Sequence, residues 1–229
     1  MAVIIEFVTL FLAIFIPMII IVDPLSTLAL FISMTSDRDR KEQILTARDA
    51  IIYASAFLVL FAIAGRYILD YMGISIEALK VSGGLLLAIF GLNMLKEGEH
   101  VEASRVEEIA EGHSAAEAGH QGELPTGGKV PRGGDIALVP LAIPLLAGPG
   151  AISFCVVAMG EHRAEWYLVI LAIAVTMAIT FTLLLNAPKI LKYIGPNGTR
   201  ALTRIMGFLT VALGIAYAMN GLASWIKSI

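Results

Sequence analysis

One carboxylate inside an apolar run is the first residue of this sequence that could do chemistry. Asp23 precedes Pro24, and Ser26 follows in the same turn. A carboxylate deep in a bilayer costs roughly 2.5–3.5 kcal/mol on insertion scales, so it must face a cavity, carry a proton or meet donors. Asp before Pro is also a good helix start. We predict two compatible roles for Asp23, a helix cap and a solute contact or proton carrier. The Ser26 hydroxyl has either a structural or a solute-binding role.

A second candidate is the run Gly148-Pro149-Gly150, whose proline lies 125 residues after Pro24. Glycines allow the backbone to approach another group closely. A helix that begins at Pro149 would direct the free amides of its first turn toward the middle of the membrane. Two opposed helix N-termini would suit the carboxylate of a ligand. The alternative is a kink that serves packing only.

The composition requires these residues to be placed by membrane helices. Of the 229 residues, 58% are hydrophobic and 15% are charged, and the mean hydropathy is +0.83. Soluble domains are about 45–50% apolar and about 25% charged, so an ordinary soluble domain is excluded. The net charge of −3 argues against a nucleic-acid partner. Cys155, the single cysteine, cannot form an internal disulfide and is expected to be a small hydrophobe.

Six apolar segments predict an all-α, polytopic membrane protein, because backbone groups in a bilayer must be paired internally. The first and fourth segments contain prolines and are expected to be broken. Asn93 and Asn220, near the ends of the third and sixth segments, either line a solute pathway or bond between helices. The segments cover about 4–34, 51–69, 79–95, 136–159, 166–187 and 202–225.

The two halves of the chain resemble each other. Gly84 and Gly91 in the third segment recur as Gly207 and Gly214 in the sixth, 123 residues later. We predict three parts: a three-helix repeat over 1–96, an acidic cytoplasmic linker over 97–134, and a second repeat over 135–229. Three spans per half is an odd number, so the second copy must be inverted, as in many secondary transporters.

The cations predict the orientation of the chain in a cell inner (plasma) membrane. Twelve of the sixteen Lys and Arg fall on one predicted face, which we assign to the cytoplasm, so both termini are expected outside. The linker holds His100, His113 and His120 among glutamates. Their spacing matches no strong metal motif, so we expect a solvated tether and no metal.

Motifs for catalysis are missing from the sequence. It contains no Gly-rich phosphate loop with Lys-Ser/Thr and no His-Glu-x-x-His, and no histidine lies in an apolar segment. We therefore expect that the protein is not an enzyme and that it binds no cofactor.

Three runs resemble the MarC family of integral membrane proteins, also called UPF0056, which includes the SnatA amino-acid transporters. They are Ile20-Ile21-Val22-Asp23-Pro24-Leu25, Lys80-Val81-Ser82-Gly83-Gly84-Leu85-Leu86-Leu87 and 139–152 around Gly148-Pro149-Gly150. The resemblance implies six spans and proton-coupled transport of small neutral amino acids such as glycine and alanine. Many relatives have Asn before the first proline and Gly two residues after it, where this chain has Asp23 and Ser26.

The sequence thus predicts a secondary transporter with its site between the two broken segments. The helix amides would hold the carboxylate of an amino acid, and Asp23 or unwound carbonyls would hold its ammonium group or a coupling proton. Two alternatives remain open, a passive channel for small solutes and a membrane scaffold that transports nothing. The partners expected are an amino acid, a proton and the lipid bilayer; a homo-oligomer is left open.

Overall fold

The computed structural model describes residues 1–35, 38–97, 146–162 and 164–227. Within these ranges all regular secondary structure is helical. The helices are α1 (Ala2–Val22), α2 (Pro24–Thr35), α3 (Arg40–Met72), α4 (Ile76–Glu97), α7 (Pro149–Glu161), α8 (Trp166–Leu185) and α9 (Ala187–Lys227).

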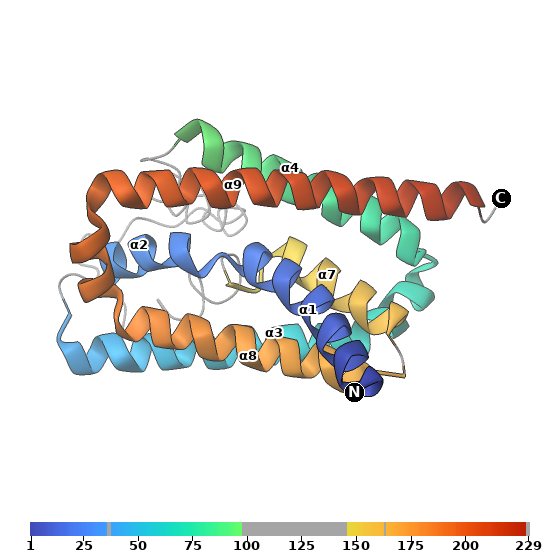
Figure 1. The fold of residues 1–229 in the computed structure, drawn as a ribbon, viewed down its shortest axis with the longest axis horizontal. Helices are drawn as coiled ribbons and strands as arrows, with labels where there is room; N and C mark the ends of the chain where they lie inside the picture. Colours follow the sequence, from blue (N-terminus) through green and yellow to red (C-terminus); the bar gives the residue numbers. More distant parts are fainter. Residues whose placement is uncertain (36–37, 98–145, 163, 228–229) are drawn as a thin grey trace, which may run out of the picture.

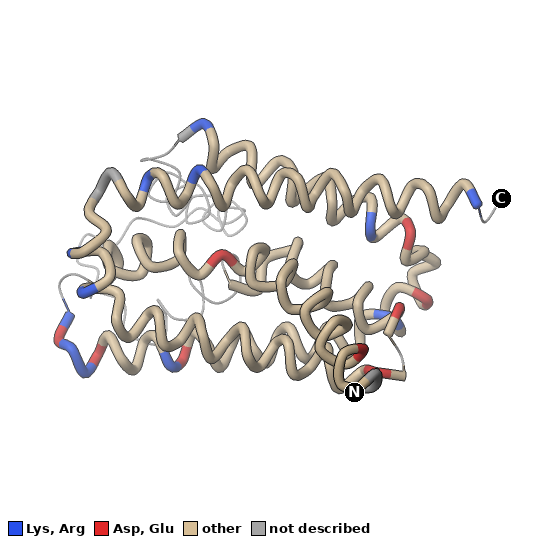
Figure 2. Tube along the Cα trace, in the orientation of Figure 1, with Lys and Arg blue, Asp and Glu red and all other residues tan. Residues whose placement is uncertain are grey.

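The described helices form an elongated bundle and run mostly along its long axis (Figure 1). Both chain termini lie at one end, which we call the terminal end. Lys and Arg gather at the opposite end, which we call the basic end (Figure 2). That end includes the start of α3, with Arg40 and Lys41, and the start of α9, with Lys189 and Lys192.

Five stretches of the described chain are long and apolar enough to cross a membrane, and the chain is an integral membrane protein with multiple helical spans. They cover Ile4–Thr35, Arg40–Met72, Ile76–Lys96, Trp166–Leu185 and Gly198–Lys227. Of the predicted fourth segment, the structure describes the shorter apolar helix α7, and residues 136–145 lie outside the described ranges. Residues 98–134 of the linker, with its three histidines, also lie outside them.

The first segment is broken where the sequence predicted. α1 ends at Val22 and α2 begins at Pro24, whereas Pro17 lies within the continuous α1. The second segment is longer than predicted, because its polar approach is also helical and α3 begins at Arg40. The predicted fifth segment, 166–187, corresponds to α8, which ends at the C-cap residue Asn186, whose side chain donates to the Thr182 carbonyl at 2.8 Å.

Glycines allow α4 and α9 to pack backbone against backbone. A methyl group added at Gly84 would lie 2.5 Å from the Gly214 carbonyl oxygen, and one at Gly91 would lie 2.6 Å from the Gly207 carbonyl oxygen. Small residues permit this kind of close approach between membrane helices. These four glycines therefore have a packing role at the α4–α9 contact.

Candidate functional site

The backbone changes direction at Asp23, which ends α1 and caps α2. Its φ of 44° and ψ of 70° are left-handed, a region that Asp tolerates better than most side chains. The Asp23 N–H donates to the Ile19 carbonyl at 3.1 Å, and Asp23 Oδ1 accepts the Ser26 N–H at 3.3 Å. Thr27 Oγ1 donates to the Asp23 carbonyl at 2.9 Å. The predicted cap therefore exists, and it uses one of the two carboxylate oxygens.

The other carboxylate oxygen is left over. Asp23 is 4% exposed, and within the described part of the chain its Oδ2 has no hydrogen-bond partner. The hydroxyl of Ser26 is buried close by along the chain and is likewise unpartnered there. Leaving a buried polar group unpaired costs about 1–3 kcal/mol, and more for a charged one. A cap alone would not need this second oxygen, so the geometry leaves room for a ligand or proton role.

The second break presents backbone donors and no side chain. Gly148 stands before α7 with φ −61° and ψ 166°, an N-cap geometry, and it supplies no side-chain hydrogen bond. Pro149 fills the first helical position, and the first backbone bond runs from the Ile152 N–H to the Gly148 carbonyl at 3.0 Å. Amides of a first helical turn lack acceptors within their own helix. Gly150 is buried, whereas Pro149 is exposed and Gly148 is half-buried.

Both half-helices begin in the middle part of the bundle and run to opposite ends. From there α2 runs to the basic end and α7 to the terminal end (Figure 1). α1 packs against α7, and Val22, Ala147 and Ala151 belong to one hydrophobic cluster. The positive ends of two helix dipoles therefore point into the central region. The structure brings the predicted residues Asp23, Pro24 and Ser26 to one start, and Gly148, Pro149 and Gly150 to the other.

The two asparagines suggested for a pathway are not brought together. Asn93 is half-buried near the end of α4, and Asn220 is exposed in the last two turns of α9. α4 and α9 run antiparallel, with Gly84 against Gly214 and Gly91 against Gly207, so the two amides lie near opposite ends of this pair. Cys155 is fully buried in the apolar core, as expected.

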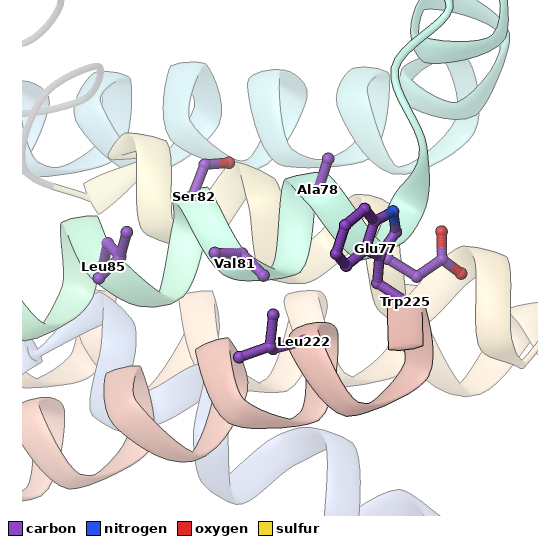
Figure 3. A pocket seen from close by; sticks show the side chains of 7 residues that line it. All are labelled: Glu77, Ala78, Val81, Ser82, Leu85, Leu222 and Trp225. Atoms are coloured by element: carbon purple, nitrogen blue, oxygen red, sulfur yellow. The ribbon is translucent and has the colours of Figure 1, made fainter. Parts of the chain in front are cut away.

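A groove on the outside of the α4–α9 pair is separate from this site. It measures about 350 Å³ and is lined by α4 and α9 side chains only (Figure 3). Leu85, Leu222 and Trp225 contribute to it, and each is about half exposed. None of the candidate site residues lines it, so we interpret it as part of the apolar outer surface.

Sequence reasoning missed the residue that covers the start of α7. Leu87 on α4 is 5% exposed, and a methyl group added at Gly150 would lie 2.4 Å from its Cδ2 atom. The only signal in the sequence is its place in an apolar run shared by many equivalent leucines. In the described part of the chain, no group of three or more His, Cys, Asp or Glu could hold a metal ion.

The helical bundle, with its apolar spans and a buried carboxylate where the first span is broken, is that of a polytopic integral membrane protein. The MarC family integral membrane protein model matches residues 8–226, so the chain belongs to the MarC family. It is 38% identical over 204 residues to the UPF0056 membrane protein MJ1677 of Methanocaldococcus jannaschii, covering 88% of this chain and 90% of that relative.

Bacterial relatives share the same extent. The UPF0056 inner membrane protein MarC of Escherichia coli is 31% identical over 219 residues, with 90% of each chain covered. That of Salmonella typhimurium is 30% identical over the same length and coverage. These names place the bacterial relatives in the inner membrane. No solved structure matches the chain.

Proposed function

We propose that this protein is a secondary transporter of small neutral amino acids such as glycine and alanine, coupled to protons. The observation that carries the proposal is the pair of half-helix starts in the middle of the bundle. One start holds a buried carboxylate oxygen, Asp23 Oδ2, that has no partner among the described residues, and the other holds the first turn of α7, to which Gly148 contributes no side-chain cap. The first can take an ammonium group or a proton, and the second can take a carboxylate. An α-amino acid carries both an ammonium group and a carboxylate, and its transport makes and breaks no covalent bond.

The small size of the proposed substrate agrees with the crowding around α7. Leu87 fills the space over Gly150, and Ala147 and Ala151 are buried beside it. Asp23 itself is sealed at 4% exposure. The burial of this carboxylate favours a carrier that exposes it to one side at a time over an open pore.

We further propose that the two halves are inverted copies, related by a pseudo-two-fold axis. Adding 123 to Gly84 and Gly91 gives Gly207 and Gly214, and each glycine of one helix contacts the non-equivalent glycine of the other. The Gly84–Gly214 contact thus converts into the Gly91–Gly207 contact, a reciprocity that is typical of a two-fold axis. The half-helices follow the same pattern: α7 packs on α3 and α4, and α2 packs on α8 and α9.

Alternating access would then come from rocking of one half against the other around the central site. The basic end would face the cytoplasm, since cations favour that side of the membrane. The terminal end would face the periplasm or the cell exterior.

Uptake and counterflow of labelled glycine and alanine in proteoliposomes test this proposal, each with and without a pH gradient. We expect saturable counterflow and stimulation by the gradient. Linear, non-saturating flux without counterflow would favour the passive channel. If neither amino acid binds or moves under any gradient, the substrate assignment is wrong.

A further inference from the structure

One ion pair ties the two halves of the chain together at the terminal end. Lys80 lies in the second turn of α4, and its side chain is 10% exposed. Its Nζ donates to Oε1 of Glu161, the last residue of α7, whose side chain is 48% exposed. By contrast, the Arg66–Asp70 ion pair lies within α3 and joins no two helices. Lys80–Glu161 is therefore a charged bridge between α4 and α7.

The bridge closes one end of a continuous seam that leads to the candidate site. Next along it, Ser153 Oγ of α7 donates to the Leu79 carbonyl of α4 at 3.1 Å. A methyl group added at Gly83 would lie 2.1 Å from Ser153 Oγ, so the helices touch there as well. The seam ends where Leu87 covers Gly150 in the first turn of α7. α4 thus lies on α7 from its last residue back to the start where we place the substrate carboxylate.

α9 completes the surroundings of the bridge. Gly221 leaves room for the lysine, since a methyl group added there would lie 2.7 Å from Lys80 Cβ. Tyr217, one α9 turn earlier, stacks at a tilt on Phe154 of α7 with 5.9 Å between the ring centroids. Its hydroxyl is buried and has no hydrogen-bond partner among the described residues. The Tyr217 hydroxyl is therefore a further polar group next to this stretch of α7 that could donate a hydrogen bond to a solute or accept one from it.

Opening this seam has a chemical requirement. Lys80 is the buried member of the pair, and separating it from Glu161 without a replacement partner leaves its charge uncompensated, which is costlier than the intact pair. Water can hydrate Glu161, which is half exposed, but Lys80 sits among helices. A solute that carries one carboxylate and one ammonium group would supply the partner that each residue loses.

We propose that Lys80 and Glu161 form a second solute site at the terminal end, in which an amino-acid zwitterion exchanges partners with the ion pair. The Lys80 ammonium takes the solute carboxylate, the Glu161 carboxylate takes the solute ammonium, and α4 separates from α7. When the solute moves on, the pair re-forms and closes the seam. This site rests on the proposed transport function and adds a gate with its own binding chemistry to it.

The test compares single, double and swapped variants of the pair in glycine counterflow. Each single variant, Lys80→Met or Glu161→Gln, leaves one charge unpaired and should slow counterflow about tenfold. The swapped pair, Lys80→Glu with Glu161→Lys, keeps both charges and should return the rate to within about threefold of wild type. Glycine binding to Asp23 and α7, measured in detergent, should stay within about twofold, since the central site is untouched.

A matched control removes the ion pair that bridges no helices. Arg66→Met with Asp70→Asn should leave counterflow within about twofold of wild type, because this pair is exposed and lies within α3. Should the single variants fail to fold, Lys80→Met with Glu161→Gln leaves no unpaired charge. It should keep the maximal rate and raise the KM for glycine about tenfold.

The outcomes separate this site from the proposed function. Wild-type counterflow with unchanged single variants, or a swapped pair no faster than they are, overturns the second site and leaves the transport function in place. An unchanged KM in the neutral double variant does the same. A wild-type protein that moves no amino acid overturns the transport function and the second site together.

Discussion

The two half-helix starts in the middle of the bundle differ in the polar groups that they present. At Asp23 the break is held by a side chain, whose Oδ1 caps α2 and whose Oδ2 is left unpaired in the core. At Gly148 the break has no side chain, and the first turn of α7 is capped by nothing from that residue. One start therefore supplies a carboxylate and the other supplies backbone donors. In the proposed transporter, this difference would let one site hold both ends of a zwitterion.

The starts also differ in access. Asp23, Pro24 and Ser26 are all buried, whereas Gly148 is half-buried and Pro149 is exposed. The carboxylate, which is costly to dehydrate, is already buried, while the neutral donors lie nearer a surface. We expect the α7 side to meet a solute first and the Asp23 side to fix it.

Removing the charge at the first start should have the largest effect. Asp23→Asn keeps a residue that tolerates the left-handed backbone and can still cap α2, so the fold should survive. The rate of uptake under a pH gradient should fall roughly 100-fold, because the ammonium group or proton loses its charged partner. Proteoliposome uptake and a melting curve in detergent measure the two effects separately. Uptake that keeps its pH dependence would show that Asp23 is only a cap.

Making the second start resemble the first should have the next largest effect. Gly148 already has N-cap backbone angles, so Gly148→Ser can place a hydroxyl on an amide of the α7 first turn. The free energy of unfolding of the variant should rise by about a few tenths of a kcal/mol, which a slightly higher melting temperature would report. The variant should bind glycine about tenfold more weakly, because the new hydroxyl occupies that amide donor. Binding titrations and melting curves check this. Unweakened binding in a stabilised variant would remove α7 from the site.

Crowding the second start tests its size limit. In Gly150→Ala, the new methyl group would lie 2.4 Å from Leu87 Cδ2, a flexible side-chain end that must shift. We expect alanine uptake to fall about fivefold, and more than glycine uptake does. Adding Leu87→Ala should restore it, and Leu87→Ala alone should admit larger neutral amino acids. A double variant as slow as Gly150→Ala would mean that Leu87 does not limit the site.

The smallest effect is expected for the Ser26 hydroxyl, the other unpaired oxygen at the start of α2. Ser26→Ala removes a buried hydroxyl without a partner in the described chain, so the protein should not lose stability. If the hydroxyl contacts the solute, glycine affinity should fall about threefold. Unchanged glycine affinity would show that the Ser26 hydroxyl does not contact the solute.

Local features explain why the breaks were predictable. Proline at positions 24 and 149 cannot continue a preceding helix, and Asp and Gly beside them accept the required backbone angles. These effects act within one turn, so a single sequence is enough to find them. The start of α3 at Arg40 was missed for the converse reason: polar residues that extend a helix past the membrane carry no apolar signal.

The site could be predicted only in part. The sequence located the starts of both half-helices. The two asparagines proposed to line a pathway do not meet, because Asn93 and Asn220 lie near opposite ends of the α4–α9 pair. Leu87 over Gly150 and Lys80 on Glu161 were not predicted. Each of these contacts joins residues more than sixty positions apart, and nothing in the pattern of either segment specifies its partner.

The sequence by itself determined that this chain is embedded in a membrane, that it is helical, and where two of its helices begin, because burial in lipid and proline geometry act on each segment separately. The tertiary structure decided that α2 and α7 point away from a common region, and which helix covers each of them. It also decided that a lysine of α4 meets a glutamate of α7. Those choices depend on how distant helices fit against one another, and glycines such as Gly84 and Gly91 allow that fit without revealing, before folding, which surface will meet them.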